Sequence, residues 1–80
     1  MKCKYVMLVE WGIETPILFP DHLEHSAAVN PNQHKPISAG FCYIGGGDVS
    51  VYGFSTSLKI EHRPEDADII KFFLRHMGAL

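Results

Sequence analysis

Three consecutive glycines, Gly45-Gly46-Gly47, separate two runs of β-prone residues and constrain the fold more than any other feature of the chain. The flanking runs, residues 38–44 and 49–60, are rich in β-branched and aromatic side chains, which favour an extended, pleated backbone. Glycine readily adopts the positive φ angles that a tight hairpin turn requires. The sequence therefore predicts two antiparallel strands joined by a turn at Gly45-Gly46-Gly47-Asp48.

The alternation of side chains along this hairpin separates a bulky face from a small or polar one. Phe41 and Tyr43 share one face of the first strand, and Tyr52 begins the bulky face of the second. Gly53 falls on the small side, where it indicates a bulge or a close approach by another backbone. We expect the bulky, aromatic-rich side of this hairpin to be covered by the helix that follows, within residues 63–80.

The N-terminal part of the chain predicts two further strands. Residues 3–10 are apolar along most of their length, so this strand is expected to be buried on both faces and central in the sheet. Residues 15–19 form a second, shorter strand. Pro16 removes one backbone donor from it, which is typical of an edge strand or an irregular one.

Two helices complete the predicted elements. Asp21 followed by Glu24 has the spacing of a capping box and predicts a short helix over residues 22–29. The polar, proline-containing residues 30–36 predict an exposed loop. The last helix begins at Pro64 and ends before Gly78, with an apolar stripe along one side.

These elements together predict one α+β domain: a four-stranded, largely antiparallel sheet with two helices, in the order ββαββα. Eighty residues leave no room for a second core, and a chain this short gains stability from a partner or a second copy. The predicted core consists of Tyr5, Met7, Val9, Leu18, Leu23, Phe41, Tyr43, Tyr52, Phe54, Leu58, Ile70, Phe73 and Leu74.

Composition and charge exclude several classes of protein. With 46% hydrophobic and 20% charged residues the chain is globular rather than disordered. The net charge is −2 and the seven Lys and Arg residues are scattered, so no basic stripe favours nucleic acid as a partner. Binding of nucleic acid by the sheet face, through Phe41, Tyr43 and Tyr52, would require those rings to be exposed.

The apolar run from Tyr5 to Val9, closed by Glu10, is too short for a signal peptide or a membrane span. A cytoplasmic protein is therefore expected. Cys3 and Cys42 both fall in predicted strands, where free thiols pack as small hydrophobic groups. Reduced core thiols are the leading interpretation, and a disulfide between adjacent strands is the alternative.

No spacing in the chain predicts catalysis or a bound cofactor. The glycine turn lacks the Lys and the following helix of a phosphate-binding loop, and no nucleophile elbow is present. His22 and His25 are three residues apart on the predicted helix, which is compatible with a metal site, but a structural zinc ion needs four ligands. A non-enzymatic protein without a cofactor is expected, with metal binding by these two histidines as the alternative.

The remaining signals are surfaces. Trp11 lies in a turn beside Ile13, and an exposed tryptophan there would be the first residue to suspect of binding a protein partner. The second strand, with Ile17 and Phe19, is apolar and bracketed by prolines, which suits docking onto another subunit. These four residues are the predicted partner-binding site, and a homodimer is the simplest assembly. An acidic group is interpreted as a solvated helix N-terminus: Glu61, Glu65, Asp66 and Asp68.

Three stretches resemble small uncharacterised proteins encoded by tailed bacteriophages and prophages. They are Ile17-Leu18-Phe19-Pro20-Asp21-His22, Ile37-Ser38-Ala39-Gly40-Phe41, and Ser57-Leu58 followed by Arg63-Pro64-Glu65-Asp66-Ala67. The resemblance implies a phage-encoded accessory protein and transfers no catalytic residue. Small phage proteins of this kind are often inhibitors or adaptors of host or phage proteins, anti-CRISPR proteins among them. The alternative function is a small-ligand or metal-binding module that uses His22, His25 and the turn at residues 45–48.

Overall fold

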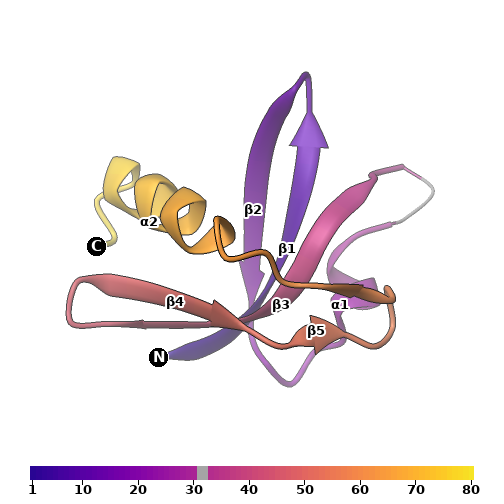
Figure 1. Ribbon diagram of the computed structural model, residues 1–80, viewed down its shortest axis with the longest axis horizontal. Coiled ribbons are helices and arrows are strands. Elements are labelled where there is room, and N and C mark those ends of the chain that lie inside the picture. The colour runs from indigo at the N-terminus through magenta and orange to yellow at the C-terminus, as the bar shows by residue number, and fades with distance from the viewer. Residues whose placement is uncertain (31–32) are drawn as a thin grey trace.

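A computed structural model describes residues 1–30 and 33–80 of the chain (Figure 1). The predicted loop at residues 30–36 falls partly outside these residues. The elements follow in the order β1 (Lys2–Glu10), β2 (Ile13–Phe19), α1 (His25–Ala28), β3 (Pro36–Gly45), β4 (Asp48–Tyr52), β5 (Phe54–Ser55), β6 (Ile60–Glu61) and α2 (Asp66–His76). The α+β class is confirmed, whereas the order ββαββα is matched only roughly because the small β5–β6 pair was not predicted.

The main sheet has four antiparallel strands in the order β2-β1-β3-β4. β1 is central and β2 lies at an edge, as the sequence predicted. Figure 1 shows the β1–β2 hairpin extending away from β4 and α2, with its turn at the far end. In this antiparallel ladder Pro16 pairs with Met7 at a position where a backbone N–H would point away from β1. Pro16 therefore removes a donor from the outer edge of the sheet and none from the ladder.

The predicted glycine turn is confirmed, but the prediction of one long strand after it is wrong. Gly45 pairs with Asp48, and Gly46 and Gly47 between them have φ angles of 60° and 76°. The returning strand ends at Tyr52 because Gly53, with φ 73°, turns the chain away. A Cβ atom on Gly53 would lie 2.8 Å from the Phe41 ring, so this is the close approach that the glycine permits.

Two clusters of buried side chains lie on opposite faces of the sheet. The first, between the sheet and α2, contains Cys3, Tyr5, Met7, Cys42, Val49, Ile70 and Leu74. We call this side of the sheet the helix-covered face. The second cluster lies against α1 and the chain from β5 to β6, and contains Val6, Leu8, Phe19, Val29 and Ala39. β1, β2 and β3 thus send alternate residues toward two separate cores, whereas β4 contributes only to the first.

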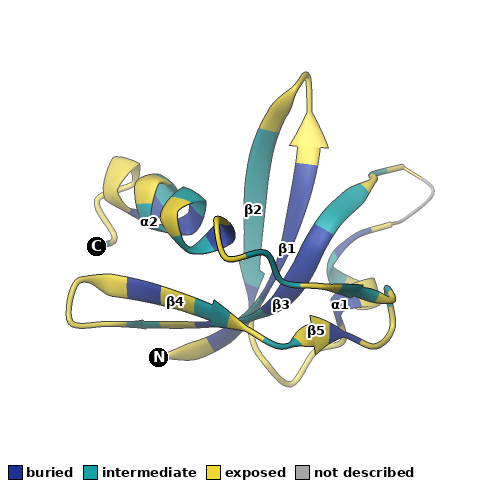
Figure 2. Cartoon of the chain, viewed as in Figure 1, coloured by how far each residue is buried: buried dark blue, intermediate teal, exposed yellow. Residues whose placement is uncertain are grey.

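The predicted core is right for the residues under α2 and wrong for most of the aromatic ones. Tyr5, Met7, Ile70 and Leu74 are buried, whereas Leu18, Phe41, Leu58 and Phe73 are only partly buried. The remaining predicted core residues are exposed: Val9, Leu23, Tyr43, Tyr52 and Phe54 (Figure 2). The sequence correctly placed the rings on one shared face, but α2 packs on the opposite face, which carries Cys42 and Val49.

Both helices are shorter than the sequence predicted. α1 starts after Glu24, whose side chain makes no capping hydrogen bond, and it excludes His22. α2 starts at Asp66. The Arg63 and Pro64 carbonyl groups before it accept hydrogen bonds from the N–H groups three residues later, those of Asp66 and Ala67, which makes a turn tighter than an α-helix. Within residues 1–30 and 33–80 no helix has the length and apolar character needed to cross a membrane.

Candidate interaction surfaces

A buried carboxylate at the start of α2 is the feature that sequence analysis most clearly missed. Asp66, assigned to a solvated acidic group, is fully buried. Tyr5 Oη and Ser38 Oγ each donate to Asp66 Oδ2 at 2.6 Å. The Arg63 Nε donates to Asp66 Oδ1 at 3.0 Å, and the same guanidinium also pairs with Glu14. These bonds connect α2 to β1, β2 and β3.

The surroundings of Asp66 determine its charge. Burial alone would raise the pKa of this carboxyl, but the hydrogen bonds from Ser38, Tyr5 and Arg63 outweigh burial and lower the pKa below its ordinary value. The pKa of Tyr5 is raised by burial and by its bond to the carboxylate. All the acceptor atoms of Asp66 face protein donors, so this cluster holds the fold together. One feature of the sequence could have predicted this cluster, namely the three-residue spacing of Arg63 and Asp66. The Asp66 carboxylate accepts the Arg63 backbone N–H, which is one of the two hydrogen bonds of a capping box.

The two histidines of the alternative metal site differ in their surroundings. His25 is buried, its Nε2 donates to the Gly40 carbonyl at 2.8 Å, and its ring packs edge-on against Phe19 and Phe41. Burial and the charge of Lys4 lower the pKa of His25. His22 is exposed and precedes α1. Among the described residues no three His, Cys, Asp or Glu side chains gather as a metal site would require.

The two cysteines face each other across neighbouring strands. Cys3 on β1 pairs with Cys42 on β3, and their Sγ atoms lie 2.6 Å apart. Both are buried free thiols, in line with the leading interpretation. The hydrogen bond with Cys3 and burial both raise the pKa of the Cys42 thiol.

The turn of the β1–β2 hairpin carries a fully exposed tryptophan. Trp11 and Gly12 occupy the turn with φ angles of 55° and 74°, and the Trp11 side chain is 99% exposed. Ile13 is 63% exposed beside it, and Val9 is also exposed. We call Val9, Trp11 and Ile13 the hairpin tip. The other two predicted partner-binding residues lie elsewhere: Ile17 is partly buried and Phe19 belongs to the second core cluster.

The second exposed surface is the half of the sheet opposite α2 that α1 and the β5–β6 chain leave uncovered. On neighbouring strands Lys4 pairs with Phe41, which pairs with Tyr52, and Lys2 pairs with Tyr43. The Phe41 and Tyr52 rings stack with centroids 5.5 Å apart. The Nζ atoms of Lys2 and Lys4 lie 5.3 and 5.7 Å from the Phe41 centroid. We call these five residues the aromatic face.

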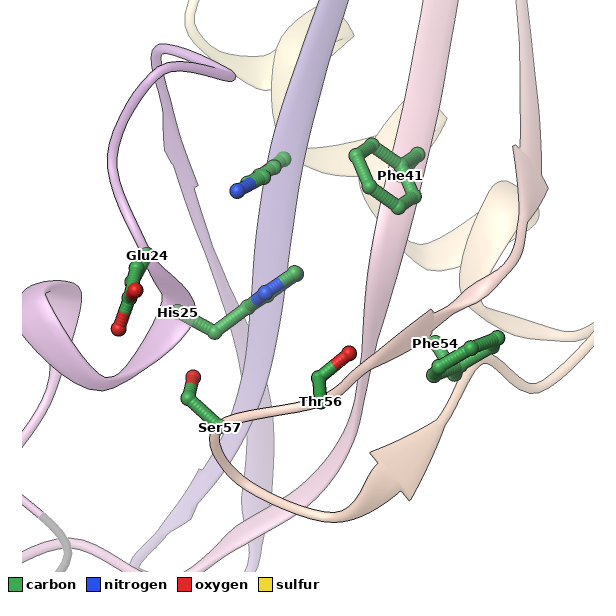
Figure 3. Close-up of a pocket in the computed structure, with 7 residues that line it drawn as sticks. Glu24, His25, Phe41, Phe54, Thr56 and Ser57 are labelled. Carbon is green, nitrogen blue, oxygen red and sulfur yellow. The ribbon is translucent and has the colours of Figure 1, made fainter.

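A pocket of about 430 Å³ adjoins the aromatic face. Figure 3 shows its lining, which comes from the start of α1, from β1 and β3, and from β5 with the turn that follows. Phe41 and Phe54 provide aromatic surface, and Thr56, Ser57 and Glu24 provide polar groups. The His25 ring also lines the pocket, and its Nε2 is engaged by the Gly40 carbonyl. The pocket therefore combines flat apolar surface with hydrogen-bonding groups.

Comparisons of the chain with protein-family models, with curated proteins and with solved structures find no match. The hairpin tip and the aromatic face are two surfaces, among the described residues, on which large side chains are exposed next to one another. They differ in chemistry. The tip presents apolar side chains at the end of an extended hairpin, whereas the aromatic face presents rings beside two ammonium groups.

Proposed function

We propose that the protein is a non-enzymatic, phage-type accessory protein that acts in the cytoplasm by binding another protein through its hairpin tip. The observation that supports this most directly is the 99% exposure of Trp11 at the end of the hairpin. A tryptophan that packed onto its own core would be largely covered. At an interface, tryptophan is among the residues that contribute most binding energy.

The backbone at the tip adds a second argument. Trp11 has φ 55°, a left-handed conformation that costs a residue with a Cβ roughly 1–2 kcal/mol and is usually taken by Gly, Asn or Asp. Local folding thus gains nothing from tryptophan at this position, either from the turn or from packing. Its effect must be sought in contact with another molecule, and the neighbouring Ile13 enlarges the apolar area available.

A homodimer is the simplest such contact. Contact through side chains is a better explanation for it than pairing of two β2 edge strands. Pro16 interrupts the row of outward-pointing backbone donors on β2. Pairing of two β2 strands would therefore lack a hydrogen bond near its centre. We expect the tip to enter an apolar pocket, either on a second copy or on a host or phage protein, so that the protein works as an inhibitor or adaptor.

Because Trp11 is the only tryptophan in the chain, its fluorescence reports on the tip directly. The test combines the emission spectrum of the protein over a dilution series with its sedimentation, and repeats both in the presence of a candidate partner. Binding through the tip shifts the emission to shorter wavelength as mass increases, and Trp11→Ala abolishes the association. The matched control is Phe72→Ala, which removes another exposed aromatic from the outside of α2.

The proposal is contradicted by a strict monomer whose Trp11 emission never changes. It is also contradicted if Trp11→Ala and Phe72→Ala weaken association equally, because exposed apolar area in general would then be responsible. Covalent capture with a photoreactive residue at position 11 gives a third readout, since cross-links should form there and not at position 72.

A further inference from the structure

We propose that the aromatic face and its pocket bind single-stranded nucleic acid, with bases stacked on the exposed rings and phosphates held by Lys2 and Lys4. This activity is separate from protein binding by the hairpin tip, because the two surfaces share no residue. Proteins that bind single strands combine aromatic platforms with a positively charged path for the backbone.

The rings of the aromatic face are accessible. Tyr43 is 54% and Tyr52 41% exposed, and Phe54 beside them is 61% exposed. They are open because α2 packs on the opposite side of the sheet. Phe41 stacks beneath this surface against Tyr52 with an interplanar angle of 15°, so it fixes the orientation of that ring. Because these flat rings are already ordered on a rigid sheet, stacking of bases on them costs little further side-chain entropy.

The charges near these rings complement a phosphate backbone. Lys2 and Lys4 hold their ammonium groups near the Phe41 ring, and the Lys4 ammonium is oriented by a hydrogen bond to the Leu23 carbonyl. The acidic side chain that lines the adjoining pocket is Glu24. Three acidic side chains, Glu14, Asp48 and Asp66, are paired with Arg63 or Lys71.

The pocket has the size and lining of a site for one base. Its volume of about 430 Å³ lies within the roughly 300–1,000 Å³ of small-ligand sites. Phe41 and Phe54 can contact the faces of a planar ring, and the Thr56 and Ser57 hydroxyl groups can bond to its edge. The Glu24 carboxylate, an acceptor only, suits an exocyclic amino group. A base paired in a duplex cannot enter such a pocket, which selects single strands.

Fluorescence anisotropy with labelled oligo(dT), oligo(dC) and oligo(U) of about ten nucleotides tests the proposal, with a blunt duplex for comparison. Saturable binding to at least one single strand and weaker binding to the duplex are expected. Tyr43→Ala and Phe54→Ala should each weaken binding by about five- to tenfold or more, and Tyr43→Phe should not. Trp11→Ala is the matched control and should bind like the wild type. Comparison of oligo(dT) with oligo(U) distinguishes DNA from RNA.

Salt dependence supplies a second readout. Two lysine contacts predict that affinity for a single strand falls about sevenfold between roughly 50 and 200 mM salt. Lys2→Gln with Lys4→Gln should flatten that dependence. The proposal is overturned by no binding at about 100 µM protein in low salt, by equal binding of the duplex, or by ring variants that remain folded and bind normally. It is also overturned if Tyr43→Ala instead disrupts a dimer, because a second copy would then occupy the face.

Discussion

The two faces of the four-stranded sheet are made by the same strands and differ in what covers them. On the helix-covered face, Tyr5 and Met7 are completely buried against α2. On the opposite face, Val6 and Leu8 are buried at one end, while Tyr43 is left open at the other. The part of the first face that lies under α2 is therefore used for folding, and part of the second face is available for binding.

The position of α2 explains this difference. The hydrogen bonds and ion pair of Asp66 fix the start of α2 over the centre of the sheet, so its apolar side covers one face. Between β4 and α2 the chain turns at Gly53 and passes over the other face as β5 and β6. That short crossing covers the end with Val6 and Leu8 and stops short of the aromatic face.

The largest predicted effect concerns the group that fixes α2. Asp66→Asn removes the negative charge opposite Arg63 and replaces one carboxylate oxygen with an NH2 group, so either the Tyr5 and Ser38 hydroxyl groups or the Arg63 guanidinium lose their acceptor. We expect a loss of about 3–5 kcal/mol in the free energy of unfolding, measured by urea denaturation. Asp68→Asn is the matched control, because Asp68 lies in the same first turn of α2 and is exposed. Similar small losses for both variants would contradict the role assigned to Asp66.

The same group makes stability depend on acid. Because the folded-state pKa of Asp66 is lowered, its contribution is complete above the unfolded pKa of about 3.9 and is lost as the pH falls through the folded value. Urea denaturation between pH 5 and pH 2 should show a steeper decline for the wild type than for Asp66→Asn. Equal slopes would mean that Asp66 is not the group responsible.

The second prediction compares the two faces directly. Met7→Ala on the helix-covered face leaves a cavity and should cost about 3 kcal/mol. Tyr43→Ala on the aromatic face removes a larger side chain that is half exposed, and should change stability by roughly 0.5 kcal/mol or less. Thermal and urea unfolding of the two variants measure the contrast. Comparable losses would show that the aromatic face contributes to folding as much as the other.

Much of this architecture followed from the sequence, and the failures have a common cause. The turn at Gly46 and Gly47, the central first strand and the C-terminal helix all depend on local signals, namely turn chemistry, apolar runs and helix-end residues. Which layer covers which face depends instead on long-range packing. Alternation put Phe41 and Tyr43 on one face, but nothing local shows whether a helix or water covers that face.

The same reasoning explains what was missed or found at the candidate sites. Asp66 resembled its exposed neighbours Glu65 and Asp68, because burial of one carboxylate depends on Tyr5, which lies 61 residues away in the chain. Trp11 was identified correctly as a turn residue, since its exposure follows from the hairpin itself. The burial of Phe19 was not foreseen, because it depends on packing of one side of β2 into the second core cluster.

A smaller effect is expected from His25, which lies beneath the aromatic face. Burial and Lys4 lower its folded-state pKa, so the unfolded chain binds a proton more readily. Stability is therefore complete above the unfolded pKa of about 6.5 and decreases as the pH falls below it. His25→Gln, which keeps a donor for the Gly40 carbonyl, should remove this decrease in melting temperature between pH 7 and pH 5. The exposed His22→Gln should not, and an unchanged slope in His25→Gln would contradict the assignment.

The last predicted change in stability has the opposite sign and concerns the hairpin tip. Trp11→Asn places a residue that tolerates left-handed φ in the turn, so it should raise the free energy of unfolding by up to about 1 kcal/mol. Lys59→Asn is the matched control, because Lys59 has φ 58° in the turn before β6 and should give a similar gain. Only Trp11→Asn should abolish association through the tip. A variant that is more stable yet cannot bind would show that Trp11 lowers the stability of the fold and is needed for binding. A loss of stability in Trp11→Asn would instead mean that the Trp11 ring packs on its own chain.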